Sequence, residues 1–319
     1  MKLYPMKLTA PCKDYIWGGN RLREEYGKVF NADKIAESWE LSCHKDGESV
    51  IEGGEFEGLT LTAFIEKQGK GVLGKNCEKF ENFPILIKLI DAKDNLSVQV
   101  HPNNEYALRV EGEYGKTEMW YIVDCDPGAE LLYGFKSNIT KEEFERRIKD
   151  NTLLEVTNNV PVHKGDVFFI EAGTLHAIGK GILSAEIQQN SNTTYRIYDY
   201  GRVGADGKPR QLHIEKAVEV TELTPPRYPT TAKGAPEEKN GYTVQLLSEC
   251  EYFRVNKVSV KEKCALEAGK ASFNSVLVLD GEGEIDGVRL KKGDSCFIPA
   301  GYGNYTFSGK AELVVTDIG

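Results

Sequence analysis

The sequence predicts a mainly β protein built from two related barrels with short helical insertions. Most of the chain consists of short segments rich in β-branched and aromatic residues and bounded by Gly, Pro and Asn, which is the pattern of strands and turns. One turn-and-strand motif occurs twice, and between its two copies residues 226–240 are rich in proline, which is excluded from helix interiors and central strands. We therefore expect a domain at 1–225, a linker at 226–240 and a second domain at 241–319.

Apolar patterning places the expected elements along both domains. Strands are predicted at 84–90, 97–101, 118–124, 129–133, 167–170, 182–188 and 193–199, and after the linker at 242–247, 252–260, 275–279, 295–298 and 312–316. Helical periodicity predicts short helices at 59–68, 104–110, 140–150 and 212–220. The helix at 140–150 has the clearest start, because Thr140 and Glu143 match a capping box in which each side chain satisfies a free backbone N–H group.

The repeated motif distinguishes the two domains chemically. The segment GDVFFIEAGTLH ending at His176 returns as GDSCFIPAGYGN ending at Asn304, with Gly, Asp, Ile, Ala and Gly at matching positions. The Gly-Asp pair makes a tight turn into a strand, and the Ala-Gly pair ends that strand. Only the first copy ends in a side chain suited to a metal ion. The sequence therefore assigns the chemistry to the first domain and predicts a metal-free second barrel.

Composition and charge limit the classes of function. The 319 residues are 40% hydrophobic and 28% charged, as in ordinary globular proteins. A net charge of -9 argues against nucleic acid, because binding to its phosphates requires a basic face. Seven cysteines without a CxxC pair suit the reduced thiols of a cytoplasmic protein, and no apolar run is long enough to predict a membrane span. The sequence does not determine the oligomeric state, and we expect a monomer.

Metal-competent side chains lie on three segments of the first domain. Side chains two residues apart point to the same face of a strand, so Gln99 shares a face with His101, and Lys116 shares a face with Glu118. If His101, Glu118 and His176 face the interior, they require a cation or hydrogen bonds, because a buried polar group without a partner is costly. Two imidazoles and a carboxylate bind a divalent metal at roughly 2.0–2.2 Å. The Gln99 amide oxygen is placed as a weaker fourth ligand.

Alternatives remain open for this set of residues. Polar residues that alternate with apolar ones also arise when one face of a strand is exposed to solvent and the other is packed in the core. A pair of histidines with one carboxylate also suits non-haem iron. Zinc with one carboxylate and three neutral ligands keeps a net positive charge, which suits the stabilisation of an oxyanion.

Five segments of the chain, in consistent order, resemble the type I mannose-6-phosphate isomerases. They cover roughly residues 11–220, with the second barrel following, and the short chain is similar to the bacterial members that lack a large helical insertion. The resemblance implies two cupin-type (jelly-roll) barrels and one Zn²⁺ per chain, held by Gln99, His101, Glu118 and His176. The segments are Tyr15-Ile-Trp17-Gly18-Gly19, Ala36-Glu37-Ser38-Trp39-Glu40, Gln99-Val-His101-Pro102, Lys116-Thr-Glu118-Met-Trp120, and Ala172-Gly173-Thr174-Leu175-His176-Ala177 with the stretch that runs on to Arg196.

The resemblance also implies an activity, the interconversion of mannose 6-phosphate and fructose 6-phosphate through a cis-enediol, with a sugar phosphate as the small-molecule partner. This reaction needs a base that moves a proton between C2 and C1, and electrophilic groups near O1 and O2. Glu186 lies ten residues before Arg196, the spacing of the family's active-site glutamate and arginine, and we predict that both are catalytic. We expect burial to raise the pKa of Glu186. Lys88, Lys116 and Ser97 match pocket positions of the family and are predicted to bind substrate.

Each role has a plainer alternative. Glu186 could pair only with a neighbouring lysine, Arg196 could cover apolar surface with its stem, and Ser97 could simply line the barrel. For the whole protein, one alternative is another metal-dependent cupin enzyme, such as an iron oxygenase or a different sugar isomerase. The other is a non-catalytic sugar-binding protein with two cupin barrels.

Overall fold

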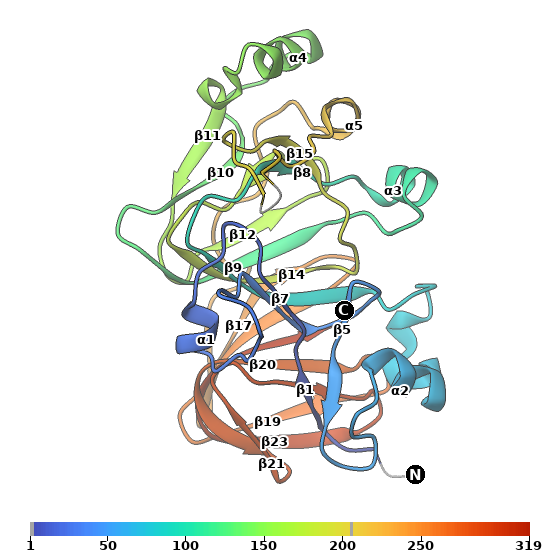
Figure 1. Cartoon of the computed structure of the whole chain (residues 1–319). Helices are drawn as coiled ribbons and strands as arrows, with labels where there is room; N and C mark the ends of the chain where they lie inside the picture. The colour runs from blue at the N-terminus through green and yellow to red at the C-terminus, as the bar shows by residue number, and fades with distance from the viewer. Residues whose placement is uncertain (1–2, 205–206) are drawn as a thin grey trace.

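The structure, a computed structural model, describes residues 3–204 and 207–319. Two β units are stacked one on the other, and strands outnumber helices throughout, so the prediction of a mainly β fold is confirmed (Figure 1). The upper unit contains the middle of the chain together with residues 12–13 and 37–41. The lower unit contains the last third of the chain together with residues 6–9 and 50–52. None of the helices in the described parts of the chain has both the length and the apolar composition needed to cross a bilayer.

The upper unit has two antiparallel sheets. Apolar side chains from both sheets, among them Trp120, Tyr133 and Phe168, form one core cluster, as expected for a jelly roll in which two sheets face each other. The six-stranded sheet has the order β12 (Val167–Ile170), β9 (Glu118–Cys125), β14 (Ile182–Gln189), β7 (Ile85–Ala92), β3 (Glu37–Leu41) and β2 (Cys12–Lys13). The five-stranded sheet has the order β11 (Thr157–Pro161), β10 (Glu130–Phe135), β13 (His176–Ala177), β8 (Val98–Val100) and β15 (Tyr195–Tyr198).

Helices cover the far side of the five-stranded sheet. Phe144 of α4 (Lys141–Lys149) and Ala217 of α5 (Ile214–Val220) pack against apolar residues of β8, β10 and β15. The capping prediction is confirmed, because Thr140 Oγ1 accepts a hydrogen bond of 3.1 Å from the Glu143 N–H group. The remaining helices are α1 (Arg21–Glu24), α2 (Leu61–Gln68), α3 (Asn104–Val110), and the 3-10 turns η1 (Lys70–Leu73), η2 (Lys75–Cys77) and η3 (Leu153–Glu155).

The lower unit is a curved ten-stranded sheet around its own apolar core. Its path is β16 (Glu237–Lys239), β17 (Tyr242–Glu249), β18 (Arg254–Val260), β23 (Gly303–Asp317), β20 (Asn274–Ile285), β22 (Ser295–Ile298), β1 (Met6–Thr9) and β6 (Val50–Glu52), with β19 (Lys263–Ala268) on β23 and β21 (Val288–Lys291) on β20. β4 (Cys43–His44) and β5 (Gly47–Glu48) form a separate small hairpin.

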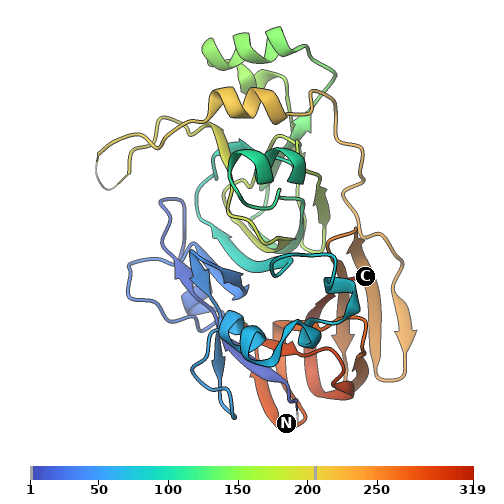
Figure 2. The same ribbon diagram turned by 90° about the vertical axis from the view of Figure 1, so that its right-hand side faces the viewer.

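The connections between the strands refine two expectations. Among the described residues no sheet closes on itself, so the expected barrels are open jelly-roll-like units. β1 pairs with β22 and β6, which places the start of the chain in the sheet of the last third (Figure 2). β16 lies inside the segment expected to be a linker. The division at 1–225, 226–240 and 241–319 stays a prediction.

The two copies of the repeated motif have the same local geometry. In each copy an aspartate side chain accepts a hydrogen bond from the backbone N–H three residues earlier, at 2.8 Å for Asp166 and 3.0 Å for Asp294. Each turn then leads into a short strand, β12 or β22. The copies differ at their ends, because His176 is fully buried whereas Asn304 is exposed to solvent.

Candidate active site

The predicted metal-binding residues meet where strands of both sheets come together. His176 in β13 lies directly opposite Gln99 in β8, and Glu118 is the first residue of β9. The His101 and His176 Nε2 atoms are 3.1 Å apart. The Glu118 carboxylate lies 3.4 Å from His176 Nε2 through Oε1 and 3.7 Å from His101 Nε2 through Oε2. The ligand atoms of the two histidines and Glu118 all lie within 4.8 Å of one another, and the three side chains are buried.

Hydrogen bonds fix the tautomer of both imidazoles. His101 Nδ1 lies 2.9 Å from the Thr193 carbonyl oxygen, and His176 Nδ1 lies 2.8 Å from that of Thr174. A carbonyl oxygen only accepts hydrogen bonds, so both Nδ1 atoms carry the proton and both Nε2 atoms present lone pairs to the cluster. Burial lowers the pKa of His176 to about 4 and also lowers that of His101, so both rings are neutral at pH 7.

These converging acceptors fit a metal cation. Two lone pairs and a carboxylate repel one another in a dry interior unless a positive charge lies among them. Glu118 Oε1 accepts no hydrogen bond from any described residue, although it is buried. The Gln99 amide lies 3.5 Å from His176 Nε2 through its nitrogen, and a half-turn of the amide would present its oxygen instead. The site therefore offers two imidazoles, one carboxylate and one amide, a donor set that suits zinc.

Lys116 adds a positive charge at the edge of this cluster. Its Nζ lies 2.8 Å from Glu118 Oε2 and 3.2 Å from His101 Nε2, so it shares a face with Glu118 as the strand pattern predicts. Burial and the nearby Glu186 carboxylate raise the pKa of Glu118 to about 7. A cation bound between the histidines would favour the ionised form of Glu118, because opposite charges stabilise each other.

Glu186 occupies a buried ion pair next to the metal-binding residues. It faces Lys88 across β14 and β7, with 3.1 Å between Lys88 Nζ and Glu186 Oε1, and Trp120 Nε1 donates a hydrogen bond of 2.9 Å to Glu186 Oε2. Burial alone would raise the pKa of Glu186, but Lys116 and Lys88 together with the Trp120 hydrogen bond hold it down to about 2. The expectation of a raised pKa is therefore wrong, because both lysines lie closer than the sequence could reveal.

A cavity of about 240 Å³ joins these groups to Arg196 and Ser97. Arg196 lies opposite Gln99 in β15, and its Nε donates a hydrogen bond of 3.2 Å to Ser97 Oγ. Arg196 thus points into the cavity and does not only cover apolar surface. The cavity is lined by Tyr15, Trp17, Glu37, Lys88, Ile90, Leu96, Ser97, Gln99, Lys116, Ile178, Glu186, Asn192, Thr194, Arg196 and Arg210.

Comparison with known proteins identifies the family. The model of the type I phosphomannose isomerase catalytic domain matches residues 6–119, and that of the mannose-6-phosphate isomerase cupin domain matches residues 243–318. The chain is 39% identical to the mannose-6-phosphate isomerase ManA of Bacillus subtilis, over 100% of both chains. The chain belongs to the type I phosphomannose isomerases.

Solved structures of phosphomannose isomerases share this fold. The crystal structure of the mannose 6-phosphate isomerase from Bacillus subtilis matches with a TM-score of 0.90 at 35% identity, over 98% of this chain and 99% of that one. A mannose 6-phosphate isomerase bound with zinc and yttrium matches with a TM-score of 0.73 at 19% identity, over 98% of both chains. As a member of the phosphomannose isomerases, the chain acts on a small sugar phosphate.

The cavity of this phosphomannose isomerase also contains residues that the sequence analysis did not select. Glu37 lies 3.6 Å from Lys88 Nζ through Oε2, which also accepts a hydrogen bond of 2.7 Å from Trp39 Nε1. The sequence could have pointed to Glu37, because this residue stands two residues before Trp39 in one of the segments that resemble the family. Arg210 gave no such signal, because it follows β15 in an irregular loop.

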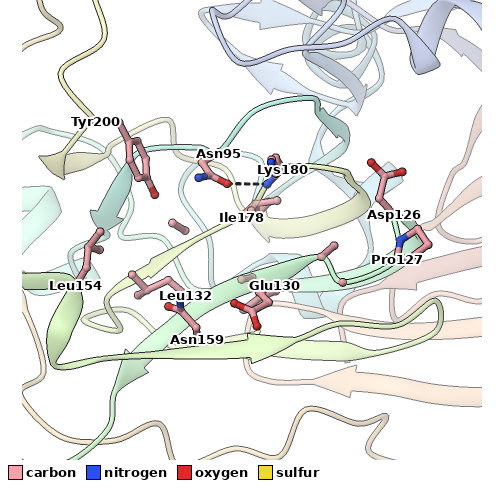
Figure 3. Close-up of a pocket in the computed structure, with 15 residues that line it drawn as sticks. Asn95, Asp126, Pro127, Glu130, Leu132, Leu154, Asn159, Ile178, Lys180 and Tyr200 are labelled. Atoms are coloured by element: carbon pink, nitrogen blue, oxygen red, sulfur yellow. Dashed lines mark hydrogen bonds between the residues drawn. The ribbon is translucent and has the colours of Figure 1, made fainter.

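A second cavity of about 410 Å³ shares the lining residue Ile178 with the first (Figure 3). Asn95 accepts a hydrogen bond of 2.8 Å there from the Lys180 N–H group. The lining contains two carboxylates, Asp126 and Glu130, and one ammonium group, that of Lys180, so this cavity carries no excess of positive charge. It does not suit a phosphorylated sugar, and none of the predicted site residues lines it.

Proposed function

We propose that this phosphomannose isomerase uses one Zn²⁺ to interconvert mannose 6-phosphate and fructose 6-phosphate through a cis-enediol. The observation that supports it most directly is the pair of unprotonated Nε2 atoms, 3.1 Å apart, beside the buried Glu118 carboxylate. His101, His176, Glu118 and Gln99 would hold the metal. When bound there, zinc would polarise the sugar oxygens on which negative charge develops. The zinc-bound relative of the same fold is consistent with this choice of metal.

Glu186 is the base in this proposal. Its carboxylate lines the cavity next to the metal-binding residues, and its depressed pKa keeps it ionised at neutral pH, as a proton acceptor must be. In the forward direction the C2–H bond of the open-chain aldose breaks and its proton moves to Glu186, while the electron pair forms the C1–C2 double bond and the C1=O π pair moves to O1. Return of the proton from Glu186 to C1, with transfer of the O2 hydroxyl proton to O1, gives the ketose. Substrate must approach within hydrogen-bond range of Glu186 for this transfer.

Arg196, Ser97 and the two lysines bind the substrate in this proposal. The Arg196 guanidinium offers several N–H donors in a fixed plane and already orients Ser97. Lys88 and Lys116 donate to sugar oxygens where negative charge forms, and Arg196 contributes to the same stabilisation. Each lysine also holds Glu186 in place, at 3.1 Å for Lys88 and 3.7 Å for Lys116.

We also propose a cytoplasmic, monomeric enzyme. All seven cysteines are unpaired in the structure, as expected for thiols in a reducing compartment.

A coupled assay tests the proposed function directly. Purified protein should convert mannose 6-phosphate to fructose 6-phosphate, should lose that activity on dialysis against a chelator, and should regain it with Zn²⁺. Oxygen consumption is measured in parallel, because an iron oxygenase of the same fold would consume oxygen whereas an isomerase does not. Full activity in protein shown by elemental analysis to be free of metal would contradict the metal-dependent mechanism.

A further inference from the structure

In the inner part of the cavity the protein's own side chains carry no excess of positive charge. These ionisable groups alternate in sign, and successive partners lie 3.6, 3.1, 3.7 and 2.8 Å apart. Two ammonium groups are thus shared among three carboxylates. A phosphate dianion next to either lysine would lie beside two carboxylates. In order, the groups are Glu37, Lys88, Glu186, Lys116 and Glu118.

The part of the cavity lined by Arg196 and Arg210 has the reverse balance. Three guanidinium groups, those of Arg196, Arg202 and Arg210, lie around the single carboxylate of Asp199. Arg210 donates to Asp199 through Nε at 2.8 Å and through Nη2 at 2.5 Å, and Arg202 donates to the same carboxylate at 2.5 Å. The hydrogen bonds of Arg196 go to a hydroxyl and a backbone carbonyl, both uncharged. Three positive charges against one negative charge leave an excess of two.

This excess is unfavourable in the free protein. Burial lowers the pKa of Arg196, and the neighbouring Arg210 lowers it further, which is the sign of repulsion between two guanidinium groups that line one cavity. A bound dianion would relieve that repulsion. Arg210 is also held in one orientation by two hydrogen bonds to Asp199, so little side-chain freedom is lost when a ligand binds.

We propose that Arg210, held in place by Asp199, binds the phosphate group of the substrate in the part of the cavity that Arg210 lines together with Arg196. The proposal rests on the proposed function, since it assumes that the sugar carbons lie between Glu186 and the metal-binding residues. A guanidinium suits this role because its planar N–H donors match phosphate oxygens, and its charge does not depend on pH in the physiological range. The phosphate thereby fixes the direction in which the sugar enters the cavity.

Arg210→Gln tests this role, with Arg254→Gln as the matched control. Arg254 also donates to a single carboxylate, that of Asp317 at 2.9 Å, but it lies in the lower unit. We expect Arg210→Gln to lower kcat/KM for mannose 6-phosphate by roughly 10- to 100-fold, the loss typical of a hydrogen bond to a charged group. The inhibition constant of inorganic phosphate should rise by a similar factor. Arg210→Lys should fall between wild type and Arg210→Gln, because it keeps the charge and loses the planar donors.

Two further measurements keep the interpretation clear. Metal content and the circular dichroism spectrum of Arg210→Gln should match those of wild type. An unchanged inhibition constant for inorganic phosphate, or an unchanged kcat/KM for mannose 6-phosphate, would overturn the role of Arg210 while wild-type isomerase activity still supported the proposed function. If wild type itself failed to isomerise mannose 6-phosphate, the proposed function would be the part that is wrong.

Discussion

Replacement of Glu186 by glutamine separates the contribution of its charge from that of its shape. Glutamine has nearly the same volume as glutamate and can still accept the hydrogen bond from Trp120. It carries no charge, however, so the buried Lys88, which is 3% exposed, keeps only the Glu37 carboxylate as a partner, with 3.6 Å between Lys88 Nζ and Glu37 Oε2. The difference between a pKa of 4.5 in the unfolded chain and about 2 in the folded protein corresponds to ~3 kcal/mol of stability. Breaking one side of a buried ion pair costs about 3–5 kcal/mol, which agrees with this value.

Urea denaturation of metal-free protein measures this loss without the contribution of metal binding. Glu312→Gln is the control, because Glu312 pairs with Lys257 at 3.0 Å on the surface with 40% of its side chain exposed. An exposed pair of this kind contributes about 0–1 kcal/mol. The folded-state pKa of Glu186 is lowered, so its contribution is present above pH 4.5 and is lost as the pH falls towards 2. Equal losses of stability in the two variants would refute the buried ion pair.

Activity of Glu186→Gln tests the same residue independently. If Glu186 is the base, turnover should fall by roughly 100- to 10,000-fold, while metal content stays at the wild-type value. Near-normal turnover with reduced stability would leave Glu186 as a structural ion-pair partner, which is the plainer alternative from the sequence.

Other perturbations address the metal and the substrate separately. Glu118→Ala should remove the metal, as measured by elemental analysis, and abolish isomerisation, and retention of both would disprove its role as a ligand. The metal affinity of wild type should weaken as the pH falls below about 7, because burial raises the pKa of Glu118 and a proton on its carboxylate competes with the cation. A metal affinity that does not change with pH in titration calorimetry would contradict this. Arg196→Ala should lower kcat/KM by roughly 10-fold or more at unchanged metal content, and equal losses of metal and activity would make it a structural residue.

Much of the fold could be predicted because local patterns dominate it. The strand expected at 167–170 and the helix expected at 104–110 match β12 and α3, and residue parity alone placed Lys116 beside Glu118. The strand expected at 275–279 is shorter than β20, which runs from Asn274 to Ile285. Gly281 and Gly283 lie within β20 in close contact with the neighbouring strand, a pairing that local sequence does not reveal.

Features that depend on contacts between residues far apart in the sequence could not be predicted. The depressed pKa of Glu186 arises from Lys116 and Lys88. Lys88 lies almost a hundred residues earlier and faces Glu186 only once β7 and β14 align. The grouping of arginines around Asp199 depends on the path of an irregular loop, for which no periodicity exists. By contrast, the metal-binding residues could be predicted from the sequence, because histidine and glutamate at interior strand positions require a binding partner.

The pairing of β1 with β22 has a consequence for synthesis of the chain. Residues 6–9 leave the ribosome long before their partners at 295–298. Until then β1 has an unpaired edge and the apolar side chains of Met6 and Leu8 lack their final packing, which is the situation that favours association between nascent chains. All strands of the upper unit, by contrast, have been made once residue 198 has left the ribosome. We therefore expect premature termination before residue 295 to yield aggregates, even though every residue of the cavity would already have been made.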